Sequence, residues 1–69
     1  MDLEDALMGL GRPVVYNCGR ADHLLESGVI TSVNTSYVFV KFGHSPGSKA
    51  CRAETLTFID DLPEGTQYK

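Results

Sequence analysis

The fold of this chain is decided by the stretch Gly28-Val29-Ile30-Thr31-Ser32-Val33-Asn34-Thr35-Ser36-Tyr37-Val38-Phe39-Val40-Lys41-Phe42. Two runs rich in β-branched and aromatic residues flank a polar Asn-Thr-Ser turn, which is typical of a β-hairpin. Asn34 suits the turn because its side chain can hydrogen-bond the backbone that follows it. We expect strands over 28–34 and 36–42. The stretch contains no nucleophile, carboxylate pair or phosphate-binding loop, so it predicts a fold and not an activity.

Length and composition limit the class of protein. The chain has 69 residues, of which 42% are hydrophobic and 22% are charged, as in ordinary globular domains. One domain is the most that we expect, with a core that contributes roughly 3–5 kcal/mol. No apolar run could span a bilayer, and the acidic start differs from a secretory signal, so we expect a cytoplasmic protein without membrane contact. The two cysteines are then expected to be free thiols.

The remaining pattern predicts further elements around the hairpin. Leucines at helical spacing predict a helix over 2–10, with acidic residues in its first turn and Gly9 and Gly11 at its end. The other predicted elements are strands at 12–17, 49–53 and 57–59, a Pro46-Gly47 type II turn, and a 3₁₀ turn at 54–56. The expected organisation is an amino-terminal helix (1–11), a barrel (12–61) and a flexible tail (62–69).

This order of elements resembles a small SH3-like barrel. The central hairpin followed by Leu56 is similar to Tudor and KOW barrels. The strand Gly11-Arg12-Pro13-Val14-Val15-Tyr16 and the Gly28-Val29-Ile30-Thr31-Ser32-Val33-Asn34 run also resemble small SH3-like proteins encoded by bacteriophages and prophages. The resemblance covers residues 11–59 and implies a mainly β, five-stranded SH3-like barrel with a binding role. A methyl-lysine cage is not implied. Such a cage needs three or four aromatic residues, and this chain has no tryptophan and six aromatic residues in all, most of them needed by the core.

Alternation along the hairpin assigns its two faces. Val38, Val40 and Phe42 share one face, which we expect to be the core. The core-facing residues that the pattern predicts are Val14, Val29, Val33, Val38, Val40, Phe42 and Leu56.

Strict alternation in the first hairpin strand places Ile30 outside, beside Tyr37 and Phe39 of the second. This outer patch is either a binding surface or is covered by the leucines of the amino-terminal helix, Leu3, Leu7 and Leu10. We expect the leucines to cover it, and the alternative is that they contact another chain.

The net charge of −3 conceals an uneven distribution. Residues 1–11 and 54–69 are acidic, whereas residues 12–53 carry five basic and two acidic side chains. Lys41, Lys49 and Arg52, with Tyr37 and Phe39, provide a candidate surface for single-stranded nucleic acid. Three or four cations are few for phosphate binding, so a solvated sheet face is the simpler interpretation.

Residues with catalytic or metal-binding chemistry are sparse. Cys18, His23, His44 and Cys51 supply the ligand types of a zinc site, but their spacing lacks the usual knuckle. Cys18 with His23 or Asp22 lacks the pocket and oxyanion donors that a nucleophilic enzyme needs. We therefore expect a non-enzymatic binding or assembly module without cofactor or metal.

The leading hypothesis for its action is protein–protein interaction, including self-association. The alternative is single-stranded nucleic-acid binding. The candidate binding residues for the two hypotheses together are Ile30, Tyr37, Phe39, Lys41, Lys49 and Arg52.

Overall fold

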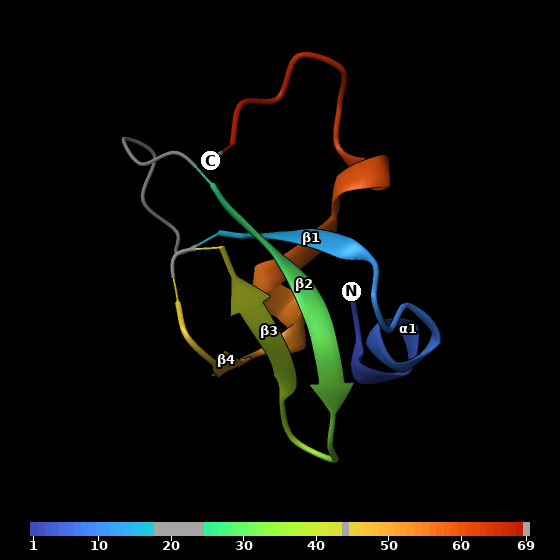
Figure 1. Cartoon of the computed structure of the whole chain (residues 1–69). Coiled ribbons are helices and arrows are strands. Elements are labelled where there is room, and N and C mark those ends of the chain that lie inside the picture. The colour runs from blue at the N-terminus through green and yellow to red at the C-terminus, as the bar shows by residue number, and fades with distance from the viewer. Residues whose placement is uncertain (18–24, 44, 69) are drawn as a thin grey trace.

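The computed structural model describes residues 1–17, 25–43 and 45–68. It contains one short helix, five strands and two 3₁₀ turns (Figure 1). These are α1 (Leu3–Met8), β1 (Pro13–Tyr16), β2 (Glu26–Val33), β3 (Val38–Phe42), β4 (Ser48–Cys51), η1 (Ala53–Thr55), β5 (Leu56–Phe58) and η2 (Ile59–Asp61). The predicted helix, central hairpin and remaining strands are confirmed, with small shifts at their ends.

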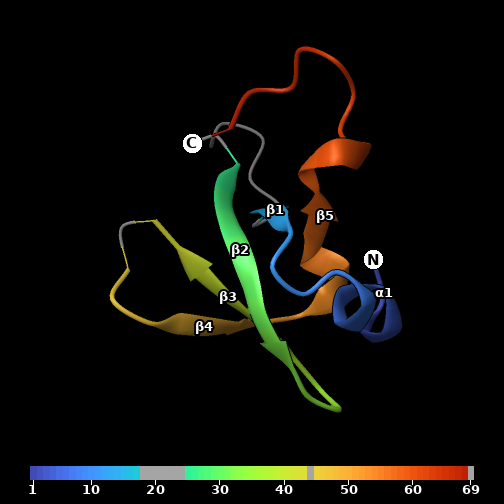
Figure 2. The same cartoon turned by 45° about the vertical axis from the view of Figure 1, so that its right-hand side comes forward.

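The five strands form one antiparallel sheet in the order β4-β3-β2-β1-β5. Figure 2 shows β2 passing through the middle, with β3 and β4 on one side and β1 and β5 on the other. Among the described residues, β4 pairs with β3 alone and β5 with β1 alone, so the sheet is not closed. A mainly β fold with five strands and one helix is confirmed, but a closed barrel is not.

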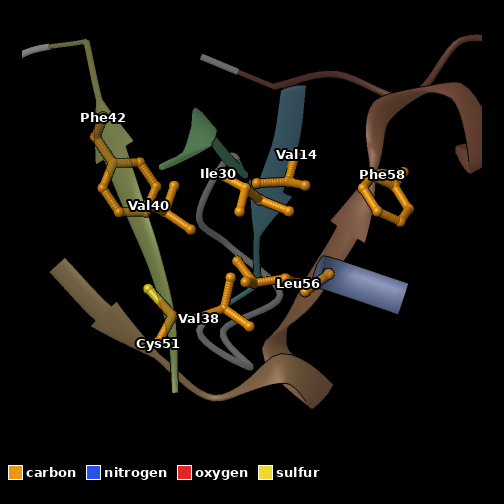
Figure 3. Close-up of a cluster of buried hydrophobic side chains, with 9 residues drawn as sticks. Val14, Ile30, Val38, Val40, Phe42, Cys51, Leu56 and Phe58 are labelled. Carbon is orange, nitrogen blue, oxygen red and sulfur yellow. The ribbon is translucent and has the colours of Figure 1, made fainter. Parts of the chain in front are cut away.

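The core lies on the concave face of the sheet, where side chains from all five strands and α1 meet (Figure 3). Val14, Val38, Val40, Phe42 and Leu56 are buried, as predicted. The other buried members of this cluster are Ala6, Ile30, Cys51 and Phe58.

A β-bulge in β2 overturns part of the face assignment. Ile30 pairs with Val40 and Ser32 with Phe39, so Thr31 is an extra residue with no partner in β3. The Thr31 hydroxyl donates to the Phe39 carbonyl at 3.1 Å. Residues before the bulge therefore have the opposite alternation from that expected.

Two predicted positions are corrected as a result. Val29 was expected in the core, but it lies on the outer face and is 41% exposed. Ile30 was expected outside and is 1% exposed. Val33, beyond the bulge, faces the core side as predicted but is only partly buried.

The hairpin loop is held by Asn34 in the predicted way. The Asn34 Oδ1 atom accepts hydrogen bonds from the backbone N–H groups of Ser36 and Tyr37 at 2.8 and 2.7 Å. The Asn34 N–H also donates to the Tyr37 carbonyl at 3.0 Å. The side chain therefore replaces backbone partners that the loop cannot provide.

The carboxyl-terminal segment folds back toward the sheet. Gly65 has φ +87° and the Thr66 N–H donates to the Pro63 carbonyl at 3.2 Å, which is the arrangement of a type II turn. Tyr68 forms a parallel bridge with Leu25. The type II turn predicted at Pro46-Gly47 is wrong, because Gly47 does not have the positive φ that such a turn requires. Whether the fold needs residues 62–69 stays a prediction.

Candidate functional site

The outer patch expected from Ile30, Tyr37 and Phe39 does not form. Ile30 packs in the core, Phe39 is half-buried on the opposite face, and Tyr37 precedes β3 with 42% of its surface exposed. The bulge at Thr31 causes this separation, because it turns Ile30 inward while Phe39 remains in the outer row with Ser32. Of the three, Tyr37 is the one available to a partner.

The predicted cations are also divided between two faces. Lys41 pairs with Val29 and Ser48, all exposed on the outer face. Lys49 pairs with Val40, and directly paired residues project to the same face, so Lys49 lies on the inner face at the edge of the sheet. Arg52 follows β4 and lines the same hollow as Lys49. The structure thus brings together Lys49, Arg52 and Tyr37, but not Lys41.

This hollow, which we call the β4 hollow, has a volume of about 530 Å³ and lies beside the edge of β4 that pairs with no strand among the described residues. Its lining includes Tyr16, Tyr37, Phe42, Lys49, Cys51 and Arg52. The rings of Tyr16 and Phe42 meet edge to face, with centroids 6.3 Å apart, and form an aromatic wall.

A second hollow, of about 590 Å³, lies between the start of α1 and η1. Tyr37 and Arg52 line both hollows and therefore stand between them. Three carboxylates, Asp2, Glu4 and Glu54, line the second one together with Arg52 and the amino-terminal Met1, so its net charge is slightly negative.

The charge in the β4 hollow comes from three side chains. Arg52 Nη1 lies 3.6 Å from Glu54 Oε1, but both side chains are more than 70% exposed, so the pair is weak. Lys49 makes no ion pair with any residue that the structure describes. Glu26 adds one negative charge at the opposite wall. The site therefore has a small positive excess on its β4 side.

Cys51 forms part of the floor of this hollow and is 7% exposed. Desolvation raises the pKa of its thiol above the ordinary value of 9.0, and the nearby Lys49 partly opposes this effect. A thiol in this state is a poor nucleophile and a poor metal ligand at neutral pH. The other residues of the hypothetical zinc site, Cys18, His23 and His44, lie outside the described residues, as does Asp22.

The helix does not cover the sheet with its leucines, which corrects the expectation that they lie over an outer patch. Ala6 is fully buried and Leu3 is half-buried against the core, whereas Leu7 and Leu10 are 55% and 49% exposed. The helix starts at Asp2, whose side chain accepts from the Asp5 N–H at 2.8 Å.

The end of α1 explains the orientation of this helix. A Cβ atom on Gly9 would lie 2.5 Å from Phe58 Cζ, so the backbone at this position lies directly on the Phe58 ring. That close approach directs Ala6 inward and leaves Leu7, Met8 and Leu10 outward. We call these three residues the helix patch; Met8, at 85% exposed, is the most accessible.

The β4 hollow was not found from the sequence, whereas Leu7 and Leu10 of the helix patch were named there in the alternative by which the helix leucines contact another chain. The hollow is lined by residues of β1, β3 and β4, so it exists only once these strands are placed relative to one another. Met8, the most exposed member of the patch, was not named because it lies off the predicted leucine stripe.

Comparison of this chain with protein-family models, with curated proteins and with solved structures finds no match. The site must therefore be interpreted from its own chemistry. None of the helices that the structure describes is long and apolar enough to cross a membrane.

Proposed function

We propose that this chain is a non-enzymatic protein-binding module of phage or bacterial origin, built on an open variant of the SH3-like barrel. Support for the barrel comes from the order of elements along the chain, with a tight central hairpin, and from η1, the 3₁₀ turn immediately before β5. These are the features on which the resemblance in the sequence rests. Support for protein binding comes from the surface of α1.

The helix patch is the observation that carries the proposal. Leu7, Met8 and Leu10 expose 55%, 85% and 49% of their surface on one short segment. Small proteins seldom leave neighbouring apolar side chains open unless a partner covers them. The first turn of α1 adds Glu4 and Asp5 beside this apolar surface, which favours a partner with basic residues.

The size of the helix patch limits the kind of complex. Stable complexes bury about 800 Å² on each partner, with roughly 20–30 residues on each side. Two side chains at the end of a six-residue helix, and Leu10 just beyond it, provide only part of such an area. The proposed complex is therefore a weak, reversible one, or one that also engages neighbouring surface.

Met8→Asp tests the proposal because Met8 contributes little to the core. We expect wild-type protein to show a faster-sedimenting species that grows between about 10 µM and about 1 mM, in the affinity range of weak association. Met8→Asp should remove it, whereas Val29→Thr, at an exposed apolar position on the sheet, should not.

A second measurement covers a partner other than this chain. A photo-reactive phenylalanine analogue at position 8 should form a cross-link in cells, and the same analogue at position 29 should not form it. A protein that stays monomeric over the whole range and gives no cross-link specific to position 8 would refute the proposal.

Single-stranded nucleic acid remains the alternative, favoured by the placement of Tyr37 beside Lys49 and Arg52 around one hollow. Its weakness is the position of Lys41 on the other face, which leaves two cations for phosphate. Titration with an oligothymidylate tests it, because a genuine complex loses affinity steeply with added salt and with Tyr37→Ala.

A further inference from the structure

The free edge of β4 and the β4 hollow form a surface separate from the helix patch. Strand β4 is the last in the sheet and pairs only with β3 among the described elements. At an edge, alternate residues direct their N–H and C=O groups away from the sheet, where another strand can pair with them. Four consecutive residues, Ser48–Cys51, provide this edge.

The side chains of β4 determine which strand would fit. Lys49 and Cys51 lie on the core side of the sheet and line the hollow, whereas the side chains of Ser48 and Ala50 alternate to the other face, with Ala50 also lining the edge of the hollow. Lys49 is unpaired among the described residues, and a lysine at an edge repels basic strands while it attracts acidic ones. Beyond Lys49, the hollow presents the Tyr16 and Phe42 rings.

We propose that the β4 edge binds an extended peptide strand that carries a carboxylate and an apolar side chain two residues apart. Residues two apart on an added strand face the same side, so both side chains enter the hollow together. The carboxylate lies opposite Lys49 and within reach of Arg52. The apolar side chain lies opposite Cys51, against the wall formed by Tyr16 and Phe42.

This arrangement matches the environment on each side of the strand. The peptide backbone supplies partners for the edge of β4, and the aromatic wall buries an apolar side chain next to a thiol that is itself largely buried. The inference goes beyond the proposed function, because it names a different surface and does not depend on α1.

The test uses synthetic peptides of roughly eight residues with a threonine-rich background. One peptide carries Glu and Phe two residues apart, a second carries Lys and Phe, and a third carries Glu and Phe adjacent to each other. Amide chemical shifts of ¹⁵N-labelled full-length protein give both the affinity and the site. We expect the first peptide to bind with a dissociation constant between about 10 µM and about 1 mM, with shifts centred on Ser48–Cys51, and to slow amide exchange there.

A charge reversal provides the specificity control. Lys49→Glu should weaken binding of the Glu-Phe peptide at least about tenfold and strengthen binding of the Lys-Phe peptide. Lys41→Glu makes the same change of net charge on the opposite face of the sheet, and it should alter neither affinity by more than about twofold.

Backbone pairing is tested separately by N-methylation of the Glu-Phe peptide. Methylation at the residues whose N–H groups face β4 should abolish binding, whereas methylation at the alternate residues should preserve it. Equal tolerance of both patterns would overturn strand addition.

Three further results would also overturn the inference: no amide shifts with about 1 mM peptide, equal binding of the peptide with adjacent Glu and Phe, or binding of an oligothymidylate in place of the peptides. The Met8→Asp variant separates this inference from the proposed function. It should retain full peptide affinity even though it loses association through α1.

Discussion

The close approach between Gly28 in β2 and Val40 in β3 gives a sharp test of the inner face. A Cβ atom on Gly28 would lie 2.6 Å from Val40 Cγ1, 2.9 Å from the Lys41 carbonyl oxygen and 3.0 Å from Phe42 Cδ1. Val40 itself is 0% exposed. The two positions therefore share one space, and substitutions at them should not be independent.

The magnitudes follow from this geometry. Val40→Ala removes two buried methyl groups, worth about 0.8 kcal/mol each, and leaves a cavity, for a total cost of about 2–3 kcal/mol in the free energy of unfolding. Gly28→Ala inserts a methyl group into filled space and should cost about 1–3 kcal/mol. In the double variant the Val40 methyl groups no longer obstruct the new Cβ. The combined cost should then be smaller than the sum by about 1 kcal/mol, and relief stays partial because the Lys41 carbonyl remains.

Urea denaturation followed by far-ultraviolet circular dichroism measures these energies, because the chain has no tryptophan to report on folding. With a slope of about 1 kcal/mol per molar urea, Val40→Ala should lower the midpoint by about 2–3 M. Sodium sulfate at about 0.5 M keeps the double variant folded, so the wild type, both single variants and the double variant are all compared in it. Val38→Ala is the matched control. Val38 is equally buried, but none of its atoms is among the three nearest to a Cβ on Gly28, so its cost should add to that of Gly28→Ala. Additive costs for Gly28→Ala with Val40→Ala, or a Val40→Ala cost below about 0.5 kcal/mol, would refute this account of the inner face.

Three other predictions concern the helix, the tail and the buried thiol. Leu7→Ala should cost less than about 1 kcal/mol in urea denaturation, because Leu7 is already 55% exposed, and a loss of 2 kcal/mol or more would mean that it packs in the core. Truncation after Asp61 should leave circular dichroism of a folded domain with a loss of about 1 kcal/mol, and an unfolded spectrum would show that residues 62–69 are needed. In a Cys18→Ser background, the stability contributed by Cys51 should be complete below pH 9.0 and fall as the pH rises above it, since the folded state holds the thiol proton more tightly than the unfolded chain. Urea midpoints between pH 8 and pH 10.5 check this, and Cys51→Ala should remove the effect.

Much of the fold could be predicted because its signals are local. The hairpin follows from two β-branched runs around Asn34, whose side chain bonds the next backbone amides whatever lies elsewhere in the chain. The helix follows from leucines at helical spacing, acidic residues in its first turn and Gly9 at its end.

The candidate site was less accessible to prediction. Tyr37, Lys49 and Arg52 were named as binding residues and do come together, but Ile30, Phe39 and Lys41 were assigned to the same surface and lie elsewhere.

The sequence by itself determined the strands, the hairpin turn at Asn34 and the presence of the amino-terminal helix, because each of these depends on neighbours only a few positions away. Tertiary structure alone decided which face the first part of β2 and the amino-terminal helix turn toward the core. The bulge at Thr31 becomes visible only when β2 is paired with β3. This one extra residue means that Ile30, and not Val29, faces the core. The outward direction of Leu7 likewise depends on contact between Gly9 and a ring 49 positions away, at Phe58. Both are consequences of long-range packing, where the space left by one element determines which side of another can be buried.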